Sequence, residues 1–441
     1  MKVLLIQLYS GTECKPVYPI GLSYLSTALT SHEVRILDQN LCGGDPFLET
    51  EKLISVFSPE VIGISIRNIH IYSTEKGYFN PDKPLSLTID AVKKISDNII
   101  IAAGGPGFSM FPIHFMQNEP GINFGVFLEG EESFPELLKN LDSPEKVKGV
   151  YWKNKDEVLY TGRYAPPDFA ALPKPHRDFI NPQKYKGEYA IGVQSKRGCM
   201  LSCIYCAYLF LSGKTLRLRP AEKVADEIEN LINNYGINEF TFVDHVFNVP
   251  KAHAEEICNE IIKRGLHVQW SAWFNEKFMD ENFVDLAIRA GCRFFEFSPD
   301  GYSNRSLKWL KKNIQTKDII NTYHLLRQKN QIKIGYNFML GIPGQNIFSL
   351  LRQAIFFLKL KVFLGKRLKL LTFNKLGIDP NTDLEKIAIS EGVITQGTDL
   401  FKPTFYEVGI IGWIKKHRGF TSVLKLLKTK TFVKSAESDG Q

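Results

Sequence analysis

The chain has 441 residues, of which 44% are hydrophobic, and its net charge is +8. This composition allows two or three packed domains and excludes a largely disordered protein. No run of about 18 charge-free apolar residues is present, so we predict no membrane-spanning helix.

Residues 1–147 alternate strand and helix patterns. The start, MKVLLIQLYSG, is predicted as a strand rather than a signal peptide, so we expect a cytoplasmic protein. Five short apolar runs are typical of buried parallel strands: KVLLIQL, EVRILDQ, PEVIGISIR, NIIIAAGG and FGVFLEG. Helical segments between them predict an open, doubly wound α/β sheet of the Rossmann or flavodoxin type, which binds ligands at the carboxyl ends of its strands.

Residues 148–189 include APPDFAALPKPHRDFINPQKY, whose five prolines predict a semi-rigid linker. From residue 190 to 385 the alternation of strands and helices restarts. About six further strand–helix units predict a full or partial barrel, in which chemistry lies on the loops after the strands.

Residues 386–441 are predicted as a helical region with a basic tail. Residues 408–436 hold seven Lys and Arg residues and no acid, whereas the rest of the chain is nearly neutral. The near-neutral remainder argues against a nucleic-acid partner. The tail is interpreted as a solvated helix or, more weakly, as a contact for an anionic membrane surface or a carrier protein.

Three cysteines lie close together in RGCMLSCIYCAY: Cys199, Cys203 and Cys206. A structural zinc site uses four ligands, and no second Cys-x-x-Cys motif is present. Three thiolates on one loop fit a 4Fe–4S cluster with one open iron, which can bind a small molecule. The alternatives are a zinc site with a distant fourth ligand, or incidental cysteines.

This Cys-x-x-x-Cys-x-x-Cys motif after the first strand of a barrel resembles the radical S-adenosylmethionine (SAM) enzymes. The resemblance implies a partial (βα)6 TIM-like barrel. It also implies that the open iron binds SAM, that the reduced cluster cleaves SAM to a 5′-deoxyadenosyl radical, and that a flavodoxin or ferredoxin supplies the electron.

Several residues match the positions at which this family contacts SAM. Tyr205 matches an aromatic position near adenine, or is an ordinary loop aromatic. Asp244 is the candidate acceptor for the SAM ammonium, although the family's neighbouring glycines are absent, and it could instead cap a turn. Ser298 and Asp300 match contacts to the SAM ribose and carboxylate.

Two further segments match more weakly. Gly341 and Gly344, in GIPG, resemble a loop that approaches adenine, or form a plain turn. Arg217 and Arg219 resemble basic residues that follow the cluster loop, and either could pair with a carboxylate or be solvated.

A doubly wound domain before such a barrel resembles the cobalamin-dependent subgroup of the family. In that case cobalamin lies at the ends of the third, fourth and fifth strands. The residues expected there are Ser65, Arg67, Asn68, Gly104, Gly105, Gly107, Glu129 and Gly130.

One departure from many cobalamin proteins concerns the cobalt ligand. The segment DQNLCGG lacks the His of their Asp-x-His-x-x-Gly motif. Either cobalt has no imidazole ligand, with Arg67 and Asn68 under the corrin ring, or cobalamin binding is lost. His70 is a rival ligand, although a lone loop His is more often hydrogen-bonded or solvated.

The resemblance implies an enzyme that uses a 4Fe–4S cluster, SAM and cobalamin to methylate an unactivated carbon of a small-molecule, lipid or peptide substrate. One alternative is radical cyclisation or rearrangement without methyl transfer. Another is a cobalamin- or iron–sulfur-binding sensor without turnover, and a zinc-stabilised binding module is the last.

Overall fold

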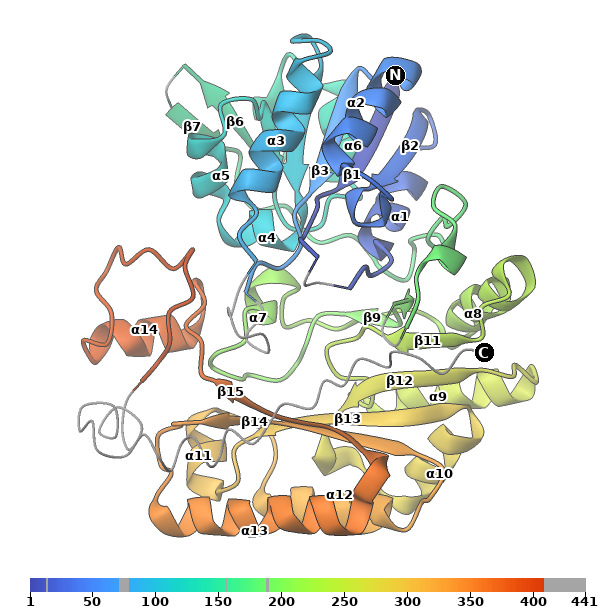
Figure 1. Cartoon of the computed structure of the whole chain (residues 1–441), viewed down its shortest axis with the longest axis vertical. Coiled ribbons are helices and arrows are strands. Elements are labelled where there is room, and N and C mark those ends of the chain that lie inside the picture. Colours follow the sequence, from blue (N-terminus) through green and yellow to red (C-terminus); the bar gives the residue numbers. More distant parts are fainter. Residues whose placement is uncertain (13–14, 71–78, 156, 188–189, 408–441) are drawn as a thin grey trace.

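The computed structural model describes residues 1–12, 15–70, 79–155, 157–187 and 190–407. Figure 1 shows two α/β units, the first above the second in that view. The predicted basic tail, residues 408–436, lies outside the described residues.

The first unit contains a seven-stranded sheet in the order β2-β1-β3-β4-β5-β6-β7. The strands from β2 to β5 are parallel, and Val3 of β1 lies beside Val34 and Val61. Its strands are β1 (Lys2–Gln7), β2 (Glu33–Asp38), β3 (Val61–Ser65), β4 (Ile100–Gly104), β5 (Phe124–Val126), β6 (Val150–Asn154) and β7 (Glu157–Tyr160). Because β1 is buried on both faces, it reads as an unbroken apolar run.

Helices cover this sheet as the sequence predicts. They are α1 (Ile20–Thr27), α2 (Pro46–Phe57), α3 (Asp82–Lys93), α4 (Gly105–Met110), α5 (Pro112–Asn118) and α6 (Ser133–Lys139). The side chain of Asp45 accepts a hydrogen bond from the Phe47 N–H (2.8 Å), which satisfies an otherwise unpaired donor at the start of α2.

The structure differs from the sequence prediction at two places in this part of the chain. Residues 150–160 begin the predicted linker, yet β6 and β7 form an antiparallel hairpin that extends the first sheet. Gly105 ends the predicted strand NIIIAAGG and Gly107 follows that strand, yet both lie in α4. Both corrections arise because tertiary packing overrides local Pro and Gly signals.

The second unit is the predicted partial barrel. Its six-stranded sheet has the order β15-β14-β13-β12-β11-β8, and all neighbours are parallel. Its strands are β8 (Gly192–Val193), β11 (Glu239–Phe242), β12 (Gln269–Phe274), β13 (Cys292–Asp300), β14 (Lys333–Leu340) and β15 (Leu368–Lys375). A short antiparallel pair, β9 (Lys196–Arg197) and β10 (Arg217–Leu218), brackets the cysteine loop.

The helices of the second unit follow the strands in the expected alternation. They are α7 (Tyr208–Leu211), α8 (Ala221–Tyr235), α9 (Lys251–Lys263), α10 (Glu281–Arg289), α11 (Asn304–Trp309), α12 (Thr316–Arg327), α13 (Ile347–Leu364) and α14 (Asp383–Ser390). Figure 1 places α7, which follows the cysteines, between the two units. Within described residues 386–407, helix is confined to the end of α14, so the helical C-terminal region is shorter there than predicted.

Candidate active site

The three cysteines lie on the loop between β9 and α7. Gly198 starts this loop at φ +86°, and a Cβ there would lie 2.1 Å from the carbonyl oxygen of Thr215, so only glycine fits. The N–H of Cys199 donates to the carbonyl oxygen of Gly213 (3.0 Å), which fixes the loop to the segment before β10. A rigid loop therefore presents all three thiols.

The three thiols are buried or half-buried, and iron must displace their protons before they can serve as thiolate ligands. Burial raises the pKa of each thiol, that of Cys206 to about 12. Among the described residues, no group of three or more His, Cys, Asp or Glu side chains is arranged to hold a single metal ion. A 4Fe–4S cluster needs another arrangement, with one thiolate on each of three irons.

Three predicted SAM contacts converge beside this loop. The Tyr205 hydroxyl donates to Oδ2 of Asp300, and Oγ of Ser298 donates to Oδ1 of the same carboxylate (3.0 Å). Asp300 adopts φ +65°, a left-handed conformation that is uncommon for a residue other than glycine. The sequence therefore identified a group of residues that the fold brings together.

Lys312 completes this group, and the sequence analysis missed it. Its Nζ lies 2.7 Å from Oδ2 of Asp300, 2.6 Å from the carbonyl oxygen of Ser298 and 3.2 Å from the Tyr205 hydroxyl. Burial alone would lower the pKa of Lys312, but the charge and hydrogen bond of Asp300, together with the charges of Cys203 and Glu276, raise it. Lys312 therefore stays charged beside the cysteine loop and orients three polar groups.

Asp244 lies just after β11, the second strand of the barrel, as expected. Its carboxylate accepts hydrogen bonds from the backbone N–H of Ser195 (2.8 Å), from the Ser195 hydroxyl, and from the N–H of Lys196 (3.1 Å). Asp244 thus holds the backbone that leads into the cysteine loop, as a turn cap does. A contact with the SAM ammonium stays a prediction.

The two glycines of GIPG lie on the loop after β14. Both have positive φ, +84° for Gly341 and +87° for Gly344. The side chain of Gln345 accepts hydrogen bonds from the N–H groups of Gly341 (3.0 Å) and Ile342 (3.2 Å). The glycines therefore form a braced turn, and its approach to adenine stays a prediction.

The glycines after β4 let two backbone segments meet at the carboxyl edge of the first sheet. A Cβ on Gly107 would lie 2.2 Å from the carbonyl oxygen of Arg67, and one on Gly105 would lie 2.7 Å from that of Ile66. Gly104 ends β4 and pairs with Ser65 of β3. The absence of a side chain on Gly105 and Gly107 thus lets the backbone pack against the loop that carries Arg67. That these glycines also let the backbone approach a flat ligand stays a prediction.

This loop also joins the first unit to the cysteine loop. Nδ2 of Asn68 donates to the hydroxyl of Tyr208, two residues after Cys206 (2.9 Å). The Tyr208 ring lies on His245, with ring centroids 4.2 Å apart. Burial lowers the pKa of His245 to about 4, so this imidazole is neutral at pH 7. The two predicted cofactor regions therefore touch through Asn68 and Tyr208.

Ion pairs next to Gly130 hold the same interface. The Glu129 carboxylate pairs with Arg197 (2.7 Å) and with Arg217 (2.8 Å), and Glu131 pairs with Arg197 (2.6 Å). Burial alone would raise the pKa of Glu129, but the two guanidinium groups hold it below its ordinary value. Glu129 is thus engaged in binding the barrel, and a cobalamin contact of Glu129 or Gly130 stays a prediction.

Two other residues of the sequence analysis have clear partners. Nδ1 of His70 lies 2.5 Å from Oδ1 of Asp379, and Nε2 lies 3.2 Å from the carbonyl oxygen of Phe401, so both ring nitrogens are engaged. Arg219 is buried and pairs with Glu227. His70 therefore follows the hydrogen-bonded alternative, and Arg219 follows the carboxylate-pairing one.

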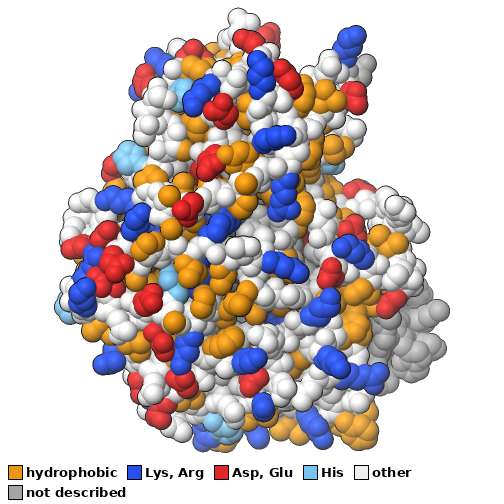
Figure 2. Space-filling view, turned by 180° about the vertical axis from the view of Figure 1, so that it is seen from behind, with side chains coloured by type: hydrophobic (Ala, Val, Ile, Leu, Met, Phe, Trp, Pro, Cys, Tyr) orange, Lys and Arg blue, Asp and Glu red, His pale blue; other side chains and the backbone are white. Residues whose placement is uncertain are grey.

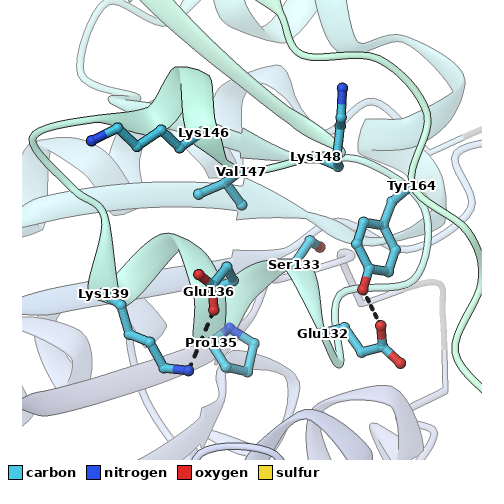
Figure 3. A pocket seen from close by; sticks show the side chains of 9 residues that line it. All are labelled: Glu132, Ser133, Pro135, Glu136, Lys139, Lys146, Val147, Lys148 and Tyr164. Atoms are coloured by element: carbon cyan, nitrogen blue, oxygen red, sulfur yellow. Dashed lines mark hydrogen bonds and ion pairs between the residues drawn. The ribbon is translucent and has the colours of Figure 1, made fainter.

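A surface depression on the first unit lies apart from these residues. Figure 3 shows that it is lined by α6, by the Lys146–Lys148 segment and by Tyr164, which donates a hydrogen bond to Glu132. None of the predicted site residues lines it. The candidate site is therefore the interface of the two units and not this depression.

Both units of the chain are similar to known proteins. Residues 14–138 match the B12 binding domain, and residues 193–352 match the radical SAM superfamily. The radical SAM methyltransferase TsrM from Kitasatospora setae, solved with cobalamin and a [4Fe-4S] cluster, has a TM-score of 0.76 and 22% identity, covering 90% of this chain and 79% of that chain. The predicted fold class is therefore confirmed.

Curated relatives extend over most of the chain. An uncharacterized methyltransferase, PH0819 of Pyrococcus horikoshii, is 27% identical over 78% of this chain and 75% of its own length. Cytidylyl-2-hydroxyethylphosphonate methyltransferase of Streptomyces wedmorensis is 25% identical over 86% of this chain and 82% of its own length. The anaerobic magnesium-protoporphyrin IX monomethyl ester cyclase of a Synechocystis strain is 27% identical over 54% of this chain and 49% of its own length.

The two domains define a radical SAM enzyme that carries a cobalamin-binding domain. The chain thus has a B12 binding domain at residues 14–138 and a domain of the radical SAM superfamily at residues 193–352. Its cofactors are a 4Fe–4S cluster, SAM and cobalamin.

Proposed function

We propose that the chain methylates an unactivated carbon of a small-molecule, lipid or peptide substrate. The observation that carries this proposal is the contact between Asn68 of the B12-binding domain and Tyr208, next to the cluster cysteines. This contact joins the two regions in which we expect the cofactors to bind. The similarity to two methyltransferases over most of the chain supports the same reaction.

We expect the following roles for the residues and cofactors of the site. When bound, the reduced cluster supplies the electron that cleaves SAM, and cobalamin supplies a carrier for the methyl group. Cys199, Cys203 and Cys206 would hold the cluster as thiolates. Lys312 holds the Asp300 carboxylate in place, so that Asp300 can orient the polar groups of SAM. An external one-electron donor, such as a flavodoxin or a ferredoxin, would complete the system.

Arg67 would face the cobalamin ring from the loop after β3. Its side chain is half-buried, and its charge acts on Asp38 and Tyr208. A cation under the ring would disfavour a sixth ligand on cobalt and so favour methyl transfer.

A second candidate function is radical cyclisation or rearrangement without methyl transfer. The similarity to a magnesium-protoporphyrin ester cyclase favours keeping this candidate. The product mass separates the two reactions, since only methylation adds a methyl group.

The experiment is anaerobic reconstitution with iron, sulfide, cobalamin and SAM, followed by reduction and mass spectrometry. We expect 5′-deoxyadenosine, which reports radical formation, and S-adenosylhomocysteine, which reports methyl donation. Cys203→Ser should abolish 5′-deoxyadenosine, whereas Cys42→Ser, a thiol outside the motif, should leave it unchanged. 5′-Deoxyadenosine without S-adenosylhomocysteine favours the second candidate, and the absence of both indicates a sensor without turnover.

A further inference from the structure

The outer face of α13 carries a continuous row of exposed apolar side chains. Six of them are more than half exposed: Ile347 60%, Phe348 71%, Leu351 54%, Ile355 53%, Leu358 62% and Val362 72%. At 3.6 residues per turn these positions fall within an arc of about 100°. Phe356, Leu360 and Leu364 point to the opposite side and are buried in the core. The helix is therefore apolar on both faces.

This outer face is unlike that of another helix of the barrel. On α8 the exposed residues are all polar, as expected for a helix whose outer face meets water: Glu222, Lys223, Asp226, Asn233 and Asn234. On α9 a single large apolar side chain, Ile262, is exposed (38%). Isolated exposed apolar residues are ordinary, whereas a contiguous row marks an interaction surface.

The charged side chains around the apolar row of α13 are all basic. Residues 347–375 contain seven Lys and Arg residues and no Asp or Glu. Arg352 and Lys359 border one side of the row, Lys361 borders the other, and all three are exposed. Elsewhere the surface is mixed: seen from behind, acidic and basic side chains alternate over most of it (Figure 2). A partner for α13 should thus combine an apolar layer with negative charge.

We propose that α13 docks the protein on an anionic lipid surface. The apolar row would enter the boundary between headgroups and acyl chains, while the bordering cations would reach up to the phosphates. No described helix is long and apolar enough to cross a membrane. A second copy of the chain fits poorly, because a symmetric contact would set this acid-free surface against itself.

The position of α13 allows such docking. Figure 1 shows α13 on the outside of the barrel, at the end of the molecule away from the B12-binding domain. Docking there leaves the interface between the two domains uncovered. The inference does not depend on the reaction proposed above, because it rests on the surface of α13 alone.

The test is co-sedimentation of the full-length protein with vesicles of phosphatidylcholine, with or without phosphatidylglycerol. We expect binding to the anionic vesicles, weakened by salt. Leu351→Glu/Leu358→Glu should lower the affinity by more than about 100-fold. Lys359→Gln/Lys361→Gln should lower it by about 25-fold, which is about fivefold for each charge. Ile262→Glu, an exposed apolar residue on another helix, should leave binding unchanged.

The melting temperature and the molar mass of each variant are measured as well, to distinguish lipid binding from the alternatives. The variants should melt like the parent protein because the replaced side chains are exposed. Equal binding to neutral and anionic vesicles, or no binding to either, overturns the proposal. A change of molar mass in the α13 variants without a change in vesicle binding shows instead a contact between copies. A lower melting temperature without a change in vesicle binding shows instead that another part of the chain covers the row.

Discussion

Asn68, at the carboxyl edge of the sheet of the B12-binding domain, donates a hydrogen bond to Tyr208, two residues beyond Cys206. The two residues are 140 positions apart in the chain and join the two cofactor domains directly. A reaction that needs both cofactors depends on their relative position, and a displacement of about 1 Å can reduce the rate of a step about 100-fold.

Tyr208→Phe should therefore separate the two activities. The substitution removes one hydrogen bond, worth about 1 kcal/mol, and leaves the cysteine ligands in place. We expect S-adenosylhomocysteine formation to fall about tenfold or more, while 5′-deoxyadenosine formation is retained. Tyr160→Phe, on exposed strand β7, is the matched control. Parallel loss of both products would show that Tyr208 acts on the cluster instead.

Lys312 should be essential for SAM binding, in contrast to its neighbour Lys311. Lys312→Met leaves the buried Asp300 carboxylate without its cation, which costs about 3–5 kcal/mol. We expect a lower melting temperature and no detectable 5′-deoxyadenosine. Lys311 pairs with Asp383 on the surface (3.1 Å), so Lys311→Met should cost less than about 1 kcal/mol and preserve activity. An active Lys312→Met enzyme would refute the role given to this lysine.

Glu276 should make the stability of the protein fall as the pH rises. Burial raises the pKa of this carboxyl from 4.5 to about 8, and its Oε1 has no hydrogen-bond partner. Between these two values the folded protein keeps the proton while the unfolded chain releases it, so folding loses up to about 4 kcal/mol by pH 8. Glu276→Gln should therefore melt at a higher temperature than the parent at pH 8, and the difference should shrink toward pH 5. The exposed Glu222→Gln should show no such trend, and a difference independent of pH would contradict the assignment.

Gly107 should tolerate no side chain. A Cβ there would meet the carbonyl oxygen of Arg67 at 2.2 Å, so Gly107→Ala must push α4 away from the loop that carries Arg67 and Asn68. We expect a loss of about 1–3 kcal/mol in stability and weaker cobalamin binding, measured by absorbance titration. Gly43→Ala, with open space around its Cβ position, is the control. Unchanged cobalamin affinity in a destabilised Gly107→Ala protein would limit the role of this glycine to packing.

The sequence predicted the fold well because its signals are local. Apolar runs such as those of β1 and β4 mark strands that are buried on both faces, and caps such as Asp45 mark helix starts. The hairpin of β6 and β7 was missed because it is stabilised by pairing with β5, which no local pattern encodes. The prolines after it gave the whole segment the composition of a linker.

Within the site, the sequence predicted the residues of local motifs better than it predicted which side chains bind one another. The cysteine motif, Tyr205 and Asp300 could be found from their neighbours in sequence. Lys312 could not, because it lies in a lysine-rich segment and differs from Lys311 only in the direction that the fold gives its side chain. For Asp244 the sequence left two roles open, and the fold gives its carboxylate partners in the turn before the cysteines, while a contact with SAM stays a prediction.

The central claim is that Cys199, Cys203 and Cys206 hold a 4Fe–4S cluster whose fourth iron is open to SAM. Electron–nuclear double resonance of the reduced, anaerobically reconstituted protein tests it, with SAM labelled by 15N at the amino group and by 17O at the carboxylate. The account predicts that both labels couple to the cluster. A cluster that shows neither coupling, or whose fourth iron keeps a protein ligand in the presence of SAM, would contradict it.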